Sequence, residues 1–362
     1  MTAAAFSVLA SSEAALAEHD YERVIDVLEA SKAAFHGDVP GELKALLDES
    51  WARMSMGQLE DAVTKLDRAR MLSESPLCDD SDRADVLYRL GCCRLKLGSV
   101  ANAVQLLTLA LSLCDAAEAP DDRLRLDILL WRTRSYRRQR DWASARADAD
   151  AAVRIAEDRN DPALLADAYM QASQVCERTG QLLVGRFYVE RASELFREAG
   201  DLRGAGQALN NLGGILFLLG SAAEAKTHLQ KAFAIALELG NDVDAGYAVA
   251  STAQVLLRGG ESAAAEENAR YALKLLGDRS DHVNEIGNAR LVLGRALLEQ
   301  GRFDEAEAAL AAAEDDFRVM DSVGHRAAAW LAQGDLASRR GLLGDAAAVY
   351  RRAAEALQDV RF

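Results

Sequence analysis

The chain has 362 residues, half of them hydrophobic, which is enough for a large core. Only 6% of the residues are aromatic and four are proline, a composition that favours an all-α fold. The formal net charge is −15, from 57 acidic and 42 basic residues. Such a charge repels phosphate backbones and anionic lipid, so we predict neither direct nucleic-acid contact nor membrane docking.

The amino terminus predicts a cytoplasmic protein. It has no basic segment of the kind that begins a signal peptide, and an acid appears by Glu13. No uninterrupted apolar run reaches the roughly 18 residues that a transmembrane helix needs. The five cysteines show no C-x-x-C spacing, so we expect free, buried thiols at Cys78, Cys92, Cys93, Cys114 and Cys176.

Glycine recurs along the chain with a period near 40 residues. The spacings are 40 or 41 residues except for one gap of 82, which Arg140 divides, and the markers are Gly57, Gly98, Gly180, Gly220, Gly260, Gly301 and Gly341. The residue five positions after each marker is small, and the residue seven positions beyond that one is always alanine. The residue seven positions before each marker is also small: Ser50, Gly91, Thr133, Ser173, Gly213, Ala253, Gly294 and Gly334. A period of this length indicates a structural repeat.

The segment NNLGGILFLLGSAAEAKTHLQKA, residues 210–232, shows what one repeat encodes. Apolar residues before Gly220 follow helical spacing, and a second helical pattern begins near Ser221. Gly220 predicts the end of the first helix, because glycine tolerates the left-handed backbone that helix ends often adopt. Gly213 and Ala225 are small enough to let the two antiparallel helices approach closely. We therefore predict a helix hairpin.

These features resemble the tetratricopeptide repeat family over nearly the whole chain. ALNNLGGILFLLGSAAEAKTHLQKA and ARLVLGRALLEQGRFDEAEAALAAA carry the pattern best. We expect a single domain, residues 1–362, of about nine repeats; they begin near residues 5, 43, 84, 126, 166, 206, 246, 287 and 327. In the first repeat His19 replaces the turn glycine. The long period is similar to that of kinesin light chain, Pins-type adaptors and bacterial peptide-sensing regulators, and the resemblance implies a right-handed superhelical solenoid.

The loops between repeats are acidic and rich in turn residues, as in SPLCDDSD, RNDP and GND. Aspartate and asparagine at such positions accept hydrogen bonds from the first N–H groups of the next helix. We therefore expect much of the negative charge to be structural.

The resemblance places the first helix of each repeat along a concave groove. From the positions that match it, we predict a peptide-binding surface made of Arg89, Trp131, Arg134, Arg138, Gln171, Gln174, Arg178, Asn210, Asn211, Gln254 and Arg258. Asn211, directly before Leu-Gly, matches the asparagine with which similar arrays hold a peptide backbone, since an amide both donates and accepts. The alternative is a solvated helix face.

Basic residues occupy one equivalent position in five repeats: Lys96, Arg138, Arg178, Arg258 and Arg339. With Arg134 and the arginine-rich segment WRTRSYRRQR they suggest a site for an acidic peptide or a carboxyl terminus. The alternative is that these cations complement helix dipoles or pair with the next loop. No repeat reproduces the lysine–asparagine set of chaperone-binding carboxylate clamps. Arg132 stands where the family has an apolar residue, which leaves the packing of that repeat open.

The sequence contains no phosphate-binding loop, nucleophile elbow or metal-ligand spacing. We therefore predict no enzyme activity, metal or cofactor, and a scaffold that binds a protein or linear peptide. The alternative is a regulatory arm related to bacterial helix-turn-helix/tetratricopeptide regulators but without its own DNA-binding domain. A third hypothesis is a homodimer through the C-terminal repeat, where Tyr350, Leu357 and Phe362 form an apolar stripe.

Overall fold

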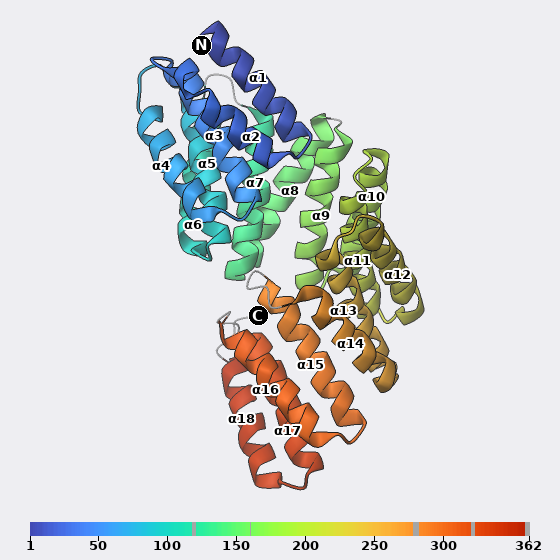
Figure 1. Cartoon of the computed structure of the whole chain (residues 1–362). Helices are drawn as coiled ribbons and strands as arrows, with labels where there is room; N and C mark the ends of the chain where they lie inside the picture. Colours follow the sequence, from blue (N-terminus) through green and yellow to red (C-terminus); the bar gives the residue numbers. More distant parts are fainter. Residues whose placement is uncertain (118–120, 160, 278–281, 320–322, 359–362) are drawn as a thin grey trace. The chain divides into compact units, whose positions relative to one another are not determined.

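The computed structural model describes the chain apart from residues 118–120, 160, 278–281, 320–322 and 359–362 (Figure 1). The described residues form eighteen α-helices and one short 3-10 helix, with no strand among them. The predicted all-α fold is confirmed. The chain divides into two compact units, an N-terminal unit, Met1–Thr179, and a C-terminal unit, Gly180–Phe362.

The N-terminal unit is built from antiparallel helix pairs that follow one another along the chain (Figure 1). Its elements are α1 (Ala3–Ala17), α2 (Tyr21–Ala30), η1 (Lys32–Phe35), α3 (Val39–Ser55), α4 (Leu59–Ser73), α5 (Asp80–Lys96), α6 (Val100–Ala116), α7 (Asp122–Gln139), α8 (Trp142–Arg159) and α9 (Pro162–Arg178). Helix α1 packs on α2, α3 on α4, α5 on α6 and α7 on α8.

The C-terminal unit repeats this pairing. Its elements are α10 (Leu182–Glu198), α11 (Leu202–Leu218), α12 (Ala222–Glu238), α13 (Asp242–Arg258), α14 (Ser262–Leu276), α15 (Val283–Glu299), α16 (Phe303–Val319), α17 (Val323–Arg339) and α18 (Leu343–Gln358). The expected pair of α9 and α10 spans the boundary between the units, so that pair and the single domain over residues 1–362 stay predictions.

Acidic and amide residues of the loops cap the first helices, as the sequence predicts. The side chains that accept a hydrogen bond from an N–H of the following first turn are Asp38, Asp79, Asp121, Asp161, Asp201 and Asn241. In the second to ninth repeats the first helix begins four residues before the start expected from the apolar pattern. In the six repeats that have such a cap, the capping side chain fixes the start of the helix one turn before the repeating apolar pattern begins.

The repeat markers lie where each helix pair turns. Gly220 has φ +84°, a left-handed conformation that costs glycine nothing. Arg140 and His19, which replace glycine in two repeats, adopt the same conformation with φ +60° and +57°. They are the only non-glycine residues with positive φ among the described residues. The turn geometry is thus imposed by the repeat even where the residue disfavours it.

Small residues seven positions before the markers set the distance between the paired helices. A Cβ placed on Gly213 would lie 2.6 Å from Cγ and from Cδ2 of Leu229 on α12. A Cβ on Gly91 would lie 2.7 Å from Cγ of Leu107 on α6. The predicted close approach is confirmed, because a side chain larger than hydrogen at either position would overlap the leucine of the partner helix unless that leucine shifted.

We expect Gly213→Ala to lower the free energy of unfolding by about 1–3 kcal/mol, because the new methyl group overlaps Leu229. Gly214→Ala is the matched control on the same helix, since a Cβ there has nothing within 4 Å. This change should raise stability by up to about 1 kcal/mol through helix propensity. Urea unfolding of both variants checks the prediction, and equal effects would contradict it.

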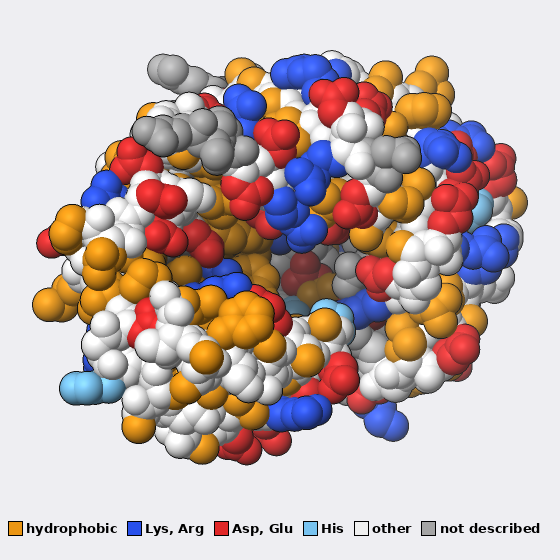
Figure 2. All heavy atoms as spheres, turned by 90° about the horizontal axis from the view of Figure 1, so that it is seen from above, with side chains coloured by type: hydrophobic (Ala, Val, Ile, Leu, Met, Phe, Trp, Pro, Cys, Tyr) orange, Lys and Arg blue, Asp and Glu red, His pale blue; other side chains and the backbone are white. Residues whose placement is uncertain are grey.

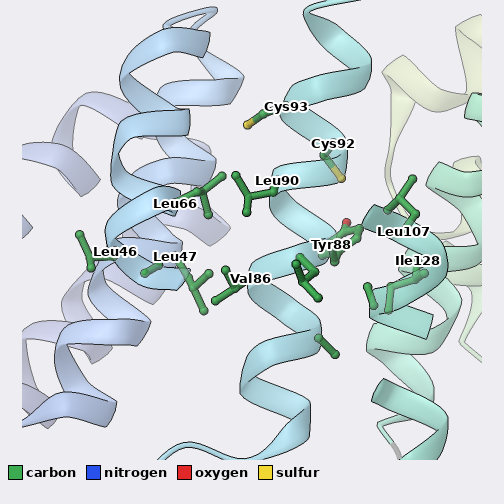
Figure 3. Packing of buried hydrophobic residues seen from close by; sticks show 14 of the residues in the cluster. Leu46, Leu47, Leu66, Val86, Tyr88, Leu90, Cys92, Cys93, Leu107 and Ile128 are labelled. Atoms are coloured by element: carbon green, nitrogen blue, oxygen red, sulfur yellow. The ribbon is translucent and has the colours of Figure 1, made fainter. Parts of the chain in front are cut away.

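The core of the N-terminal unit runs through α3 to α7 (Figure 3). Leu66, Leu90 and Leu107 are among its buried side chains. Cys92 and Cys93 lie on different sides of α5, Cys93 toward α4 and Cys92 toward α7 (Figure 3). Burial raises the pKa of Cys93 to about 11 and that of Cys92 well above its ordinary value. All five cysteines are free and buried, as predicted.

Arg132, whose position the family keeps apolar, finds a partner within its own helix pair. Its Nε and Nη2 donate to the two carboxylate oxygens of Asp148 on α8 at 2.7 and 2.8 Å. Only 13% of the Arg132 side chain and 8% of the Asp148 side chain are exposed. A bidentate ion pair therefore replaces an apolar contact between α7 and α8.

Asp48 on α3 is a buried carboxyl at the contact with α1. It accepts a hydrogen bond from Ser12 Oγ at 3.2 Å. Burial raises the pKa of Asp48 to about 6, against the attraction of Arg89 and the Ser12 hydrogen bond. Because this pKa lies above the 3.8 of a free aspartate, the charged carboxylate opposes folding at neutral pH.

We expect Asp48→Asn to stabilise the protein in a pH-dependent way. Below pH 3.8 the carboxyl is neutral in both states and the variant should match the wild type. The advantage should grow as pH rises to 6 and level off above it, at no more than about 3 kcal/mol. Denaturant unfolding at pH 4 and pH 8 measures this difference; an advantage confined to pH 4 would contradict it.

Candidate ligand-binding surface

The first helices of successive pairs contact one another within each unit, α3 with α5, α5 with α7 and α7 with α9. Helices α11, α13, α15 and α17 do the same in the C-terminal unit. Second helices such as α4 and α6 make no comparable contact in the part of the chain that the structure describes. Each unit therefore curves with its first helices inside. We call this side the inner face of each unit, and it carries all the predicted ligand-binding residues.

Arg89 is held inside the N-terminal unit. Its Nε donates to Asp85 at 2.8 Å and its Nη1 donates to the carbonyl oxygen of Leu47 at 3.0 Å, which ties α5 to α3. The guanidinium lies 5.5 Å from the ring centre of Trp51. These contacts assign Arg89 a structural role, and its predicted part in ligand binding stays untested.

Trp131 and Arg134 form a stacked pair on α7. The Arg134 guanidinium lies 4.9 Å from the centre of the indole ring. Trp131 is partly buried and packs against the core, so the ring fixes one face of the guanidinium. No hydrogen bond or ion pair is formed by the Arg134 side chain with any described residue. Its donors are therefore available to a ligand.

Gln171 and Gln174, predicted as part of a polar floor, are joined by a third α7 arginine. Arg137 Nη1 donates to Gln171 Oε1 at 3.0 Å and to Gln174 Oε1. Because both amide oxygens accept from Arg137, the two NH2 groups point elsewhere, and neither donates to a described residue. The bond connects α7 to α9 without any carboxylate.

Arg137 carries its charge among other cations. Its Nε is buried and has no hydrogen-bond partner among the described residues. Burial, and then the charges of Arg134 and Arg178, lower the pKa of Arg137 to about 10. The nearest acid that opposes this effect is Glu177, whose own pKa burial raises against the pull of Arg178 and Arg137. The positive charge of Arg137 is therefore only partly balanced by negative charge nearby.

We call Arg134, Arg137, Arg138 and Arg178 the arginine cluster. No described carboxylate lies within 4 Å of any of its guanidinium groups, although Arg123 and Arg132 on the same helix are both ion-paired. Arg137 matches a groove-facing position of the repeat but is not among the predicted ligand-binding residues, because it lies beside the equivalent position that defines the series of basic residues. The arginine density of WRTRSYRRQR was the available signal.

The basic residues at the equivalent position have different partners. Arg138 Nη1 donates to the carbonyl oxygen of Leu95 at 2.9 Å, and Arg339 Nη1 donates to that of Leu298 at 3.2 Å. Both bonds reach the last turn of the preceding first helix, where each carbonyl oxygen also accepts from the N–H of the turn glycine, Gly98 or Gly301. Lys96 and Arg178 make no hydrogen bond or ion pair with a described residue. The series is thus partly a capping device between repeats.

We expect Arg138→Ala to lower the free energy of unfolding by about 0.5–1 kcal/mol, because it removes the donor to Leu95. Lys96→Ala is the matched control, an exposed cation at the equivalent position without such a bond. It should change stability by less than about 0.3 kcal/mol. Urea unfolding measures both values; an equal loss in the two variants would contradict a capping role for Arg138.

The inner face of the C-terminal unit is lined by amides. Asn210 on α11 is partly buried, and its Oδ1 is buried without a hydrogen-bond partner in the described chain. Asn211 and Gln254 are also partly buried, on α11 and α13. Arg258 lies over the ring of Phe217, 4.5 Å from its centre, and joins the ends of the same two helices. The predicted residues of this unit therefore lie on adjacent helices.

Charge on the outer surface is mixed. Figure 2 shows Lys and Arg side chains interspersed with Asp and Glu on the face that it presents. No group of three or more His, Cys, Asp or Glu residues that could hold a metal occurs among the described residues. Within the same residues, no helix is long and apolar enough to cross a membrane.

Family models of the tetratricopeptide repeat match residues 47–123, 206–239 and 291–360. The chain belongs to the tetratricopeptide repeat family. The matched segments lie in both units, and the predicted family is confirmed. No curated protein matches this tetratricopeptide repeat chain.

Solved structures share the fold of this tetratricopeptide repeat protein. A Rap protein complexed with competence and sporulation factor is 14% identical with TM-score 0.74, over 98% of this chain and 97% of its own. Aspartyl phosphate phosphatase F from Bacillus subtilis is 14% identical with TM-score 0.61, over 82% and 76%. The Rap conjugation gene regulator of plasmid pLS20, in complex with the Phr* peptide, is 15% identical with TM-score 0.58, over 79% and 77%.

Proposed function

We propose that this tetratricopeptide repeat protein is a non-enzymatic scaffold whose inner face holds a linear peptide or an extended segment of a partner protein. The observation that supports it best is the amide-lined face of α11 and α13. A buried amide oxygen without a donor, as at Asn210, costs free energy in the unliganded protein. A ligand that supplies an N–H group removes that cost.

An extended peptide suits this face chemically. Its backbone presents donors and acceptors in alternation, and side-chain amides such as those of Asn211 and Gln254 can serve both. The Arg258–Phe217 pair offers a flat, partly apolar contact at the end of the row. The pLS20 regulator, similar in fold, is a complex with a peptide, which supports the same kind of ligand here.

A regulatory role is the second candidate. The pLS20 protein is named as a conjugation gene regulator, and the likeness in fold supports an array in which peptide binding changes the affinity for a protein partner. Aspartyl phosphate phosphatase F is named as an enzyme, but that name describes the neighbour and not this chain. We propose no chemistry for this chain, because the described part of its inner faces presents mainly amides and cations.

The proposal also includes the cellular compartment and the homodimer. Five free, buried cysteines support a reducing compartment such as the cytoplasm. For the homodimer, Phe362 lies outside the described residues, and Leu357 packs within the last helix pair. Tyr350 donates to Asp335 at 2.6 Å in that pair, so a dimer would use only what these contacts leave exposed.

We expect a peptide to remain bound to freshly purified protein and to be detected by native mass spectrometry. Once its sequence is known, Asn211→Ala and Gln254→Ala should each weaken its binding by about tenfold, since each removes one amide contact. Isothermal titration calorimetry measures the change.

Gln230→Ala is the matched control, because Gln230 is exposed on the second helix α12 of the same unit. It should leave the affinity unchanged within about twofold. Unaltered affinity in both inner-face variants would reject this face as the peptide site. A shift of DNA by the purified protein alone in a gel assay would contradict the absence of direct nucleic-acid contact.

A further inference from the structure

The arginine cluster is a local exception in an acidic protein. The chain carries a net charge of −15, and several partly buried arginines elsewhere in the N-terminal unit are ion-paired, as Arg53 is with Glu49 and Arg132 with Asp148. At the C-terminal ends of α7 and α9 the cations face amides, a backbone carbonyl and an indole ring. Like charges held this close raise the free energy of the unliganded protein.

The helix dipole does not explain this arrangement alone. Cations in a last turn gain about 0.3–1 kcal/mol from the dipole, which applies to Arg137, Arg138 and Arg178. Arg134 lies one turn earlier, where the dipole is weaker, and it is nevertheless left without a carboxylate. The acids of the same inner face, Asp85 and Asp127, are paired with arginines nearer the other ends of their helices.

We propose that the arginine cluster, with the amide groups of Gln171 and Gln174, binds the carboxylates of an acidic peptide segment. This site lies wholly in the N-terminal unit and is separate from the amide-lined face of the C-terminal unit. Arg134 and Arg178, which donate to no described residue, can each bind a carboxylate through two parallel N–H groups, while Arg137 and Arg138 add positive charge to the site. The two glutamine NH2 groups supply further donors, since Arg137 occupies their oxygens.

Several features favour an acidic peptide over other anions. The cations are distributed over two helices rather than gathered around one point, which suits successive side-chain carboxylates. The Trp131 ring beside Arg134 offers an apolar contact to the methylene groups between them. Nucleic acid is disfavoured as a ligand because the net negative charge of the protein repels its phosphates at long range. Glu177 is the internal acid that the ligand's carboxylates would outnumber.

The test uses the full chain and an acetylated hexaglutamate peptide, followed by calorimetry and by tryptophan fluorescence. We expect hexaglutamate to bind and hexaglutamine of equal length not to bind. Arg137→Gln should weaken hexaglutamate binding by about tenfold, because it removes one positive charge from the site and the bonds that hold the two glutamine oxygens. Arg178→Gln, at an exposed side chain that makes no hydrogen bond or ion pair with a described residue, should weaken it without affecting the fold. Trp131→Phe should remove the fluorescence change and keep the heat of binding.

Arg154→Gln is the matched control. Arg154 is exposed on the second helix α8 of the same unit, so this change removes one positive charge away from the cluster. An equal loss of affinity in this variant would reduce the interaction to non-specific attraction and overturn the proposal. So would absence of hexaglutamate binding, or inorganic phosphate that binds more tightly and depends on Arg137. A peptide found with the purified protein that depends on Asn211 but not on Arg137 would leave the proposed function standing and reject this inference alone.

Discussion

The distance between the two helices of each pair is the constraint on which the rest of the structure depends. It is set where a side chain of the second helix occupies the space of a missing Cβ, as Leu229 does against Gly213. The left-handed turn at Gly220 returns the chain antiparallel in a few residues. Once every pair has this spacing, the first helices of neighbouring pairs meet along one side, and that side carries the polar residues available to a ligand.

The inner faces of the two units differ in chemistry although both are built from the same repeat. In the C-terminal unit the polar row consists of amides and one arginine stacked on Phe217. In the N-terminal unit it includes the arginine cluster, which has no carboxylate partner, beside two glutamines and the ion pair of Arg89 and Asp85. Because the core positions of the repeat fix the fold, the inner positions are free to vary, which is how one architecture serves different ligands.

One equivalent position illustrates how environment decides the role of a residue. Arg138 and Arg339 donate to the last turn of the preceding first helix, whereas Arg258 stacks on an aromatic ring. The sequence presents these as one series of basic residues with a single function. All five side chains are exposed, and the neighbours that each one meets divide the series into capping members, a stacked member and members without a hydrogen bond or ion pair to a described residue. Arg137, one residue before the series, makes the bonds that connect α7 to α9.

The sequence by itself determined the helix pairs, their turns, their caps and the burial of the small residues, because these depend on contacts within about forty residues and on the conformational freedom of single positions. It even placed the turn at Arg140, where the expected glycine is missing. Only the tertiary structure decided that Arg132 pairs with Asp148, that Arg89 is committed to Leu47, and that the arginine cluster lacks carboxylates. Those outcomes depend on which side chains of separate helices come within hydrogen-bond distance, and periodicity carries no information about distances between particular side-chain atoms.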